Sequence, residues 1–276
     1  MNRYKEIPIF FTIDDGYAPF LAVALHSAIQ NADPSRQYKA IVLHQDLSEP
    51  NITKLQALQT ENFQIELTPM KANFQALDDR MSNRLRCDYF TLTIYFRLFI
   101  PAMFPQYDKG IYIDSDVVLT DDIGKLFDID IGDNLLGACN DLSIADIAPL
   151  VAYTENAVGV KKEEYINSGV LLMNMANIRK SGLFRKCREL CRDKKMFMPD
   201  QTALNKLAVK RKLPARYNAQ GKIKPDTVFK HFTTFFRFFP YFRAVTIKPW
   251  DTDRLHNELG IYEFDDILDA YKRSNE

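Results

Sequence analysis

The stretch Ile7-Pro8-Ile9-Phe10-Phe11-Thr12-Ile13-Asp14-Asp15-Gly16-Tyr17 decides the fold class. Its first seven residues are almost all apolar, as in a strand that is buried on both faces of a parallel sheet. The apolar run stops at two aspartates, and a helix is expected over residues 19–31. We therefore predict that the fold begins with a buried strand followed by a crossover helix.

The same alternation continues along the next part of the chain. A second strand is predicted over 39–44, a helix from Ser48 to about residue 60, and a half-buried strand over 63–68. This is the βαβ pattern of an α/β fold with a Rossmann-like, mostly parallel sheet flanked by helices. The other expected elements are a buried helix over 91–100, strands over 110–113, 135–139 and 168–173, and helices over 177–196, 200–209 and 261–271.

The composition bounds the class of protein. The 276 residues are 46% hydrophobic and 26% charged, which is typical of globular proteins, and the sequence predicts one domain. Because Lys plus Arg (36) equals Asp plus Glu (36), a nucleic-acid binder acting by bulk positive charge is not expected. Residues 1–160 hold 12 basic and 22 acidic residues, whereas residues 161–248 hold 21 and 6. This asymmetry suits partners of opposite charge, such as a cation on the first part and phosphates on the second, while most of the basic residues are expected to form an ordinary solvated helix surface.

Cysteines and apolar runs predict a reducing, cytoplasmic setting. The four cysteines are irregularly spaced and form no Cys-x-x-Cys, which argues against a disulfide scaffold and a zinc knuckle. Cys187 and Cys191 are expected to be buried thiols on one helix face. No signal peptide is expected from the first residues, and no apolar run of about 18 residues occurs in the sequence.

The motif Asp114-Ser115-Asp116 follows the predicted strand 110–113 directly. In extended backbone, residues i and i+2 point the same way, so both carboxylates can converge on one divalent ion such as Mg²⁺ or Mn²⁺. Two further Asp-x-Asp motifs occur, at 128–130 and 251–253. Only the first lies at the carboxyl end of an apolar strand, where open α/β sheets bind ligands, and it is therefore the predicted metal site.

Other polar residues leave alternatives open. Asp14 and Tyr17 follow the first strand and suit a nucleoside, or Asp14 caps the next helix. Arg97 interrupts an apolar run and is either paired with an acidic site, a phosphate or a structural carboxylate, or lies on an exposed helix face. His231 is either a metal ligand or structural. The aromatic segment Phe232–Phe242 is a candidate lid, membrane contact or core.

Six motifs occur in order over about residues 7–250 and together resemble glycosyltransferase family 8. They are Asp14-Asp15-x-Tyr17, Tyr95-x-Arg97, Tyr112-Ile-Asp-Ser-Asp116, Asn167-Ser-Gly-Val-Leu-Leu172, Asp200-Gln201, and His231 with Lys248-Pro-Trp250. The sequence is similar to bacterial lipopolysaccharide galactosyl- and glucosyltransferases. The resemblance implies the GT-A nucleotide-diphospho-sugar transferase fold, with residues 1–250 as the catalytic domain and 251–276 as its C-terminal helical extension.

The resemblance also implies an activity and a set of site residues. The activity is a retaining transfer of glucose or galactose from UDP-glucose or UDP-galactose to a saccharide or lipid-linked acceptor, with Mn²⁺ or Mg²⁺ on the diphosphate. The implied metal ligands are Asp114, Asp116 and His231. The implied nucleotide- and donor-binding residues are Thr12, Asp14, Tyr17, Arg97, Ser115 and Lys248. The implied catalytic residues are Gln201, Asp200, Asn167 and Asp141. A same-face attack is the preferred mechanism.

Two departures and two alternatives accompany this resemblance. Gly16 stands where the family often has Asn, and the step from His231 to Lys248 is 17 residues (248 − 231), longer than the family spacing. Asp114-Ser-Asp-Val-Val118 also fits the nucleophile loop of haloacid-dehalogenase phosphatases. A non-catalytic, UDP-binding protein on the same fold is the third possibility. The expected location is the cytoplasm, or the inner membrane face with Phe232–Phe242 as the contact.

Overall fold

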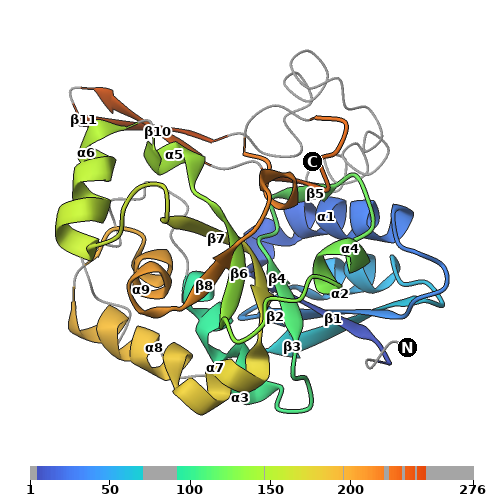
Figure 1. Ribbon diagram of the computed structural model, residues 1–276. Helices are drawn as coiled ribbons and strands as arrows, with labels where there is room; N and C mark the ends of the chain where they lie inside the picture. Colours follow the sequence, from blue (N-terminus) through green and yellow to red (C-terminus); the bar gives the residue numbers. More distant parts are fainter. Residues whose placement is uncertain are drawn as a thin grey trace.

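The computed structural model describes residues 5–70, 92–145, 147–194, 196–220, 224–231, 234–239 and 241–246. Its centre is a seven-stranded sheet with the order β3-β2-β1-β4-β7-β6-β8 (Figure 1). The strands are β1 Ile7–Ile13, β2 Tyr38–His44, β3 Phe63–Pro69, β4 Gly110–Ile113, β6 Leu136–Asn140, β7 Ile166–Met173 and β8 Lys210–Lys212. The predicted α/β class with a mostly parallel sheet is confirmed.

One strand of this sheet runs against its neighbours. β1 is parallel to β2 and β4, β2 is parallel to β3, and β6 is parallel to β8. β7 is antiparallel to both β4 and β6. Because of this reversal, the first residues of β7 lie at the edge where β4 and β6 end.

Helices cover both faces of the sheet, and each face has its own core (Figure 1). Successive strand residues point to opposite faces, so Ile9 and Phe11 enter one core while Phe10 enters the other. The first core includes residues of α1 Ala18–Gln30, α2 Glu49–Gln56 and α4 Gly124–Phe127. The second includes residues of the 3₁₀ helix η3 Leu92–Phe99, α3 Ile100–Met103, α7 Met175–Ser181, α8 Leu183–Asp193 and α9 Pro199–Leu207.

Smaller elements complete the described part of the chain. α5 Leu142–Ala145, α6 Ala148–Ala152 and the π-helix η4 Tyr153–Val158 surround a third small core. β5 Val117–Leu119 pairs with β9 Phe229–His231, and β10 Thr234–Phe239 pairs with β11 Tyr241–Thr246. Two short 3₁₀ helices are η1 Asp15–Tyr17 and η5 Ala215–Tyr217.

Two sequence predictions are wrong in detail. The helix expected over 177–196 is two helices, because Gly182 adopts a positive φ of 65° and ends α7. The helix expected over 91–100 is a 3₁₀ helix over Leu92–Phe99. The predicted helix 261–271, the extension 251–276 and Lys248 lie outside the described residues. Within the described ranges, each helix is too short or too polar to span a bilayer.

Candidate active site

Polar side chains gather at one edge of the main sheet, where β1, β4 and β6 end and β7 begins. Asp14 follows β1, Asp114 follows β4, and Asp141 follows β6. Asn167 is the second residue of β7, which reaches this edge because it runs against β4 and β6. This is the edge at which open α/β sheets bind ligands.

Asp114, Asp116 and His231 form a compact cluster of ligand-type side chains. One ligand atom from each lies within 4.8 Å of those of the other two. His231 is brought there by β9, whose pairing with β5 sets it opposite Val117, the residue after Asp116. His231 Nε2 lies 3.3 Å from Asp116 Oδ1 and 4.0 Å from Asp114 Oδ2. The long step to Lys248 therefore does not separate His231 from the two aspartates.

The chemistry of this donor set fits a hard divalent cation. Carboxylates supply the oxygen ligands that Mg²⁺ and Mn²⁺ prefer, and neutral imidazole is a common nitrogen ligand. The side chains of Asp114 and Asp116 are 28% and 15% exposed, whereas that of His231 is 5% exposed. The two carboxylates are thus partly exposed, whereas the imidazole is buried.

The backbone of β7 passes close to this cluster at Gly169. The backbone N–H of Asp114 donates to the Gly169 carbonyl at 2.7 Å. A Cβ atom on residue 169 would lie 2.2 Å from His231 Cε1 and 2.9 Å from Asp114 Oδ2. Glycine is the residue that allows this approach, which gives the Asn-Ser-Gly motif a steric reason.

Arg97 is 4% exposed, and its guanidinium contacts two carboxylates and a backbone carbonyl. Its Nη2 donates to Asp114 Oδ1 at 2.9 Å, and its Nε lies 3.2 Å from Asp200 Oδ2. Its Nη1 donates to the Ser168 carbonyl at 2.6 Å. Burial alone would lower the pKa of Arg97, but Asp114, Tyr112 and Asp200 raise it above its usual value. Pairing with acidic residues is confirmed, and the exposed helix face is excluded.

A chain of hydroxyl groups runs from β1 to Asp114. Tyr112 Oη donates to Asp114 Oδ1 at 2.7 Å and lies 2.9 Å from Thr12 Oγ1. Because the phenol has one proton and an ionised carboxylate only accepts, Thr12 must donate to Tyr112. Burial raises the pKa of Tyr112 well above its usual value, so the phenol stays protonated. Thr12 therefore acts on Asp114 through Tyr112.

Gln201 and Asp141 form a second buried group. Gln201 Nε2 donates to Asp141 Oδ2 at 2.8 Å, and Gln201 Oε1 accepts the Ser168 backbone N–H at 2.9 Å. Gln201 is 5% exposed and Asp141 is 3% exposed. Asp200, the residue before Gln201 on α9, turns instead toward Arg97. Successive residues of one helix thus serve two neighbouring parts of the site.

Two asparagines connect this group to the cluster of Asp114, Asp116 and His231. Asn218 Oδ1 lies 2.9 Å from His231 Nδ1, and Asn218 Nδ2 donates to Asn167 Oδ1 at 2.9 Å. Asn167 Nδ2 donates in turn to Asp141 Oδ2 at 3.2 Å. A continuous line of hydrogen bonds therefore links the two groups.

The aspartates that follow β1 hold the adjacent turn. Asp14 Oδ1 accepts the Tyr17 backbone N–H at 3.2 Å, as a cap of η1. Asp15 Oδ1 accepts from the Ser48 backbone and the Asn51 side chain, both at 2.8 Å. Partial burial would raise the pKa of Asp15, but these hydrogen bonds lower it below its usual value. Asp14 therefore caps η1, as one of the two sequence interpretations expected. It still lies at the edge of the sheet where β1, β4 and β6 end.

The structure also brings in residues that sequence reasoning missed. Ser168 contacts both Arg97 and Gln201, and Asn218 contacts His231. Ser168 was visible only as part of the Asn-Ser-Gly motif, and Asn218 belonged to no recognised motif. Ser115, which the sequence predicted as a site residue, lies between Asp114 and Asp116 in the chain and is 5% exposed.

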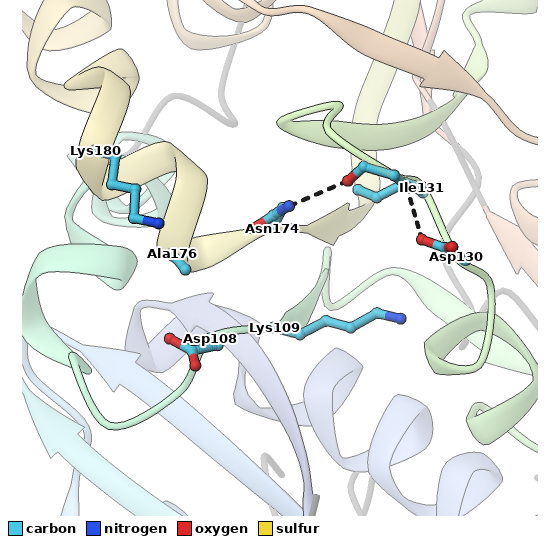
Figure 2. A pocket seen from close by; sticks show the side chains of 8 residues that line it. Asp108, Lys109, Asp130, Ile131, Asn174, Ala176 and Lys180 are labelled. Carbon is cyan, nitrogen blue, oxygen red and sulfur yellow. Dashed lines mark hydrogen bonds between the residues drawn. The ribbon is translucent and has the colours of Figure 1, made fainter. Parts of the chain in front are cut away.

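A hollow of about 360 Å³ lies at the opposite edge of the sheet (Figure 2). It is bordered by Lys109, which precedes β4, and by Asn174, which follows β7. Asp130 of the second Asp-x-Asp motif also lines it and accepts the Gly132 backbone N–H at 2.7 Å. That motif therefore lies at the opposite edge of the sheet from Asp114 and Asp116.

Known proteins resemble this chain over most of its length. The family profile described as Glycosyl transferase family 8 matches residues 8–253. A putative glycosyltransferase of Haemophilus influenzae is 29% identical over 184 residues, which are 66% of this chain and 52% of that protein. General stress protein A of Bacillus subtilis is 26% identical over 81% of this chain and 77% of its own length. The chain thus spans about half the length of the Haemophilus relative.

Solved structures share the fold. The galactosyltransferase LgtC, in complex with donor and acceptor sugar analogs, has a TM-score of 0.69 at 22% identity over 96% of each chain. The apo bifunctional glycosyltransferase WbbM has a TM-score of 0.66 at 25% identity, covering 79% of this chain and 40% of its own. The likeness confirms the predicted GT-A fold. Together, these matches favour a glycosyltransferase over a haloacid-dehalogenase phosphatase.

Proposed function

The chain belongs to glycosyl transferase family 8, and on that premise we propose that it is a retaining hexosyltransferase. It moves glucose or galactose from a UDP-sugar to a saccharide or lipid-linked acceptor. The observation that carries the proposal is the cluster of Asp114, Asp116 and His231 beside the buried pair of Gln201 and Asp141. The cluster suits a cation on a diphosphate, and the pair offers polar groups to a sugar.

Asp114, Asp116 and His231 would hold Mn²⁺ or Mg²⁺ against the donor diphosphate. When bound, the cation supplies Lewis-acid stabilisation of the negative charge on the leaving UDP. Hydrogen bonds from Arg97 (2.9 Å) and Tyr112 (2.7 Å) keep Asp114 oriented for this role. We assign Lys248 to the phosphates, where it would help to exclude water.

The nucleoside end of the donor is proposed to bind beside Asp14 and Tyr17, both of which are partly exposed. A carboxylate accepts the imide N–H of uracil and repels the acceptor nitrogen that cytosine presents at the same place. Tyr17 offers a ring face to the base. Thr12 and Ser115 complete this part of the proposed donor site.

We propose same-face transfer without a covalent enzyme intermediate. Gln201 would lie near the anomeric carbon, yet an amide is a poor nucleophile. In addition, Gln201 Oε1 already accepts a hydrogen bond from the Ser168 backbone N–H. Asp200 is ion-paired with Arg97 and 3% exposed. The acceptor oxygen therefore bonds to the anomeric carbon on the face that UDP leaves, and a phosphate oxygen takes its proton. Asn167 and Asp141 line the sugar and acceptor side.

The proposed setting is the cytoplasm, with glycolipids such as lipopolysaccharide precursors among the acceptors. Phe232–Phe242 is the proposed contact with the inner membrane face. The backbone of β10, which lies in this range, pairs antiparallel with that of β11. The abundance of Phe in this segment supports the assignment.

Thermal unfolding with UDP, alone and with Mn²⁺, tests the donor site. A ligand at 100 times its Kd stabilises the folded state by about 2.7 kcal/mol, and we expect that effect to require the metal. Release of UDP from UDP-glucose and UDP-galactose then tests turnover. Absence of stabilisation would overturn the proposal. Stabilisation without release from either sugar would indicate a UDP-binding protein, and hydrolysis of p-nitrophenyl phosphate would indicate a phosphatase.

A further inference from the structure

We propose that Asn218 is a positioning residue that dictates which ring nitrogen of His231 faces the two aspartates. Its amide holds Nδ1 as the N–H nitrogen and so leaves Nε2 with the lone pair that a cation needs. The cation itself rests on the function proposed above, whereas the assignment of the ring follows from hydrogen bonds alone.

The assignment starts from a backbone group of β7. The N–H of Gly169 donates to Asn167 Oδ1 at 2.9 Å. A backbone N–H can only donate, so the atom it meets must be the amide oxygen of Asn167. The other end of that amide is then the NH₂ group, which lies 3.2 Å from an oxygen of Asp141, an acceptor. Both contacts require the same orientation of Asn167.

The orientation of the Asn167 amide determines that of the Asn218 amide, and Asn218 in turn determines which imidazole nitrogen carries the proton. Because Asn167 Oδ1 only accepts, the atom of Asn218 that lies 2.9 Å away must be the donor Nδ2. The remaining oxygen of Asn218 lies 2.9 Å from His231 Nδ1. An oxygen acceptor at this distance requires a proton on Nδ1, so the neutral ring carries its lone pair on Nε2.

The atom left with the lone pair is the one that faces the carboxylates. His231 Nε2 lies 3.3 Å from Asp116 Oδ1 and 4.0 Å from Asp114 Oδ2. In the other tautomer, an N–H would point at these oxygens, and that nitrogen would have no lone pair for a cation. Metal-bound histidines commonly have their second nitrogen fixed by a hydrogen-bond acceptor in this way.

Burial and backbone pairing hold Asn218 in place. Asn218 is 1% exposed and His231 is 4% exposed, so water does not compete for the connecting bond. Ala219, the next residue, donates its backbone N–H to the Phe229 carbonyl at 2.8 Å, and its own carbonyl accepts from the His231 backbone at 3.1 Å. These bonds fix the position of Asn218 relative to β9.

The first experiment measures the tautomer in the wild-type protein. Two-bond ¹⁵N–¹H spectra of the [¹⁵N]histidine-labelled, metal-free chain at pH 8.5 are assigned by comparison with His231→Gln. We expect a protonated signal for His231 Nδ1 and an unprotonated one for Nε2, also after Mg²⁺ and UDP are added. The reverse pattern would overturn the assignment, whether or not the protein is an enzyme.

The second experiment separates the acceptor role of Asn218 from its packing. Asn218→Asp keeps an oxygen opposite His231 Nδ1, whereas Asn218→Leu removes it. Gln220→Leu is the matched control, because Gln220 is 2% exposed and bonds the Leu142 and Asn140 backbone rather than the ring. Binding of Mn²⁺ with UDP is measured by calorimetry, and the ring signals by NMR.

The expected results differ among the three variants. Asn218→Leu should weaken Mn²⁺ binding by about 10–100-fold and populate the Nε2–H tautomer. Asn218→Asp should retain the wild-type tautomer and metal affinity, and Gln220→Leu should alter thermal stability alone. Wild-type tautomer and affinity in Asn218→Leu would overturn the proposal. If that variant does not fold, loss of the Nδ1–H tautomer in Asn218→Asp would overturn it. Failure of UDP and Mn²⁺ to bind the wild type, with Nδ1–H intact, would instead count against the proposed function.

Discussion

Arg97 and Asp200 form an ion pair in which the two side chains are only 5% and 4% exposed. Arg97 Nε lies 3.2 Å from Asp200 Oδ2, which ties the 3₁₀ helix η3 to α9. The same guanidinium also holds Asp114 and the Ser168 carbonyl. The buried guanidinium of Arg97 therefore connects η3 and α9 to the edge of the sheet that carries Asp114, Asp116 and His231.

Replacing Arg97 should destabilise the whole protein. Arg97→Met fills similar space but leaves Asp200 buried without its partner, and we expect a loss of about 3–5 kcal/mol in the free energy of unfolding. Urea denaturation measures this loss. Arg192→Ala is the control, since Arg192 and its partner Asp193 have side chains more than half exposed, and its stability should stay at the wild-type value. A stable Arg97→Met would contradict the role of the pair.

Asp116 should be required for metal-dependent chemistry but not for folding. Asp116→Ala removes a partly exposed carboxylate, and we expect UDP release to fall by at least about 100-fold, because a bound cation supplies several kcal/mol to the transition state. Circular dichroism should remain unchanged. Asp130→Ala, in the Asp-x-Asp motif at the opposite edge, should keep full activity. A fully active Asp116→Ala would refute a metal site there.

Gly169 should tolerate no side chain. In Gly169→Ala, the added Cβ would meet His231 at 2.2 Å, so the imidazole or β7 must shift. We expect loss of Mn²⁺-dependent stabilisation by UDP. Gly132→Ala is the comparison, because its Cβ would enter open space and its cost is the positive φ of 58° alone, about 1–2 kcal/mol. Unchanged metal dependence in Gly169→Ala would show that the close approach is unimportant.

Asp15 should make stability depend on pH in the acidic range. Its pKa is lowered from 3.8 in the folded state, so its stabilising effect is complete above 3.8 and is lost as pH falls through the folded value. Asp15→Asn should therefore be less stable than the wild type at pH 7, and the difference should shrink below about pH 4. Urea denaturation at several pH values tests this. If the stability difference between Asp15→Asn and the wild type grew on acidification, it would contradict this prediction.

Cys139 and Cys187 should resist alkylation in the folded protein. Both thiols are buried, and burial raises the pKa of each to about 12, so little thiolate exists at pH 8. Peptide mass spectrometry after iodoacetamide treatment should find these two positions unmodified without denaturant and modified in guanidinium. Rapid labelling of either thiol in the native state would disprove this burial.

The sequence predicted those parts of the fold that depend on local pattern. The apolar runs of β1 and β4 and the alternation of β3 follow from burial on a sheet. The three-residue strands β5, β8 and β9 were missed because such short segments show no periodicity. The break at Gly182 was missed because the amphipathic pattern continues across it from α7 into α8.

The candidate site was predictable only where residue type implies chemistry. Asp114 and Asp116 were identified from a motif at a strand end. Asn218 and Ser168 are ordinary polar residues, and their importance lies in partners far away in the sequence. Hydrogen-bond partners of this kind are set by tertiary packing, which periodicity and composition do not encode.

The pairing of β5 with β9 also bears on how the protein assembles during synthesis. Val117 and His231 stand opposite each other although more than a hundred residues separate them. Chains emerge from the ribosome amino end first, so β1 and β2 can pair well before β9 exists. The cluster of Asp114, Asp116 and His231 is therefore closed late, after most of the main sheet has left the ribosome.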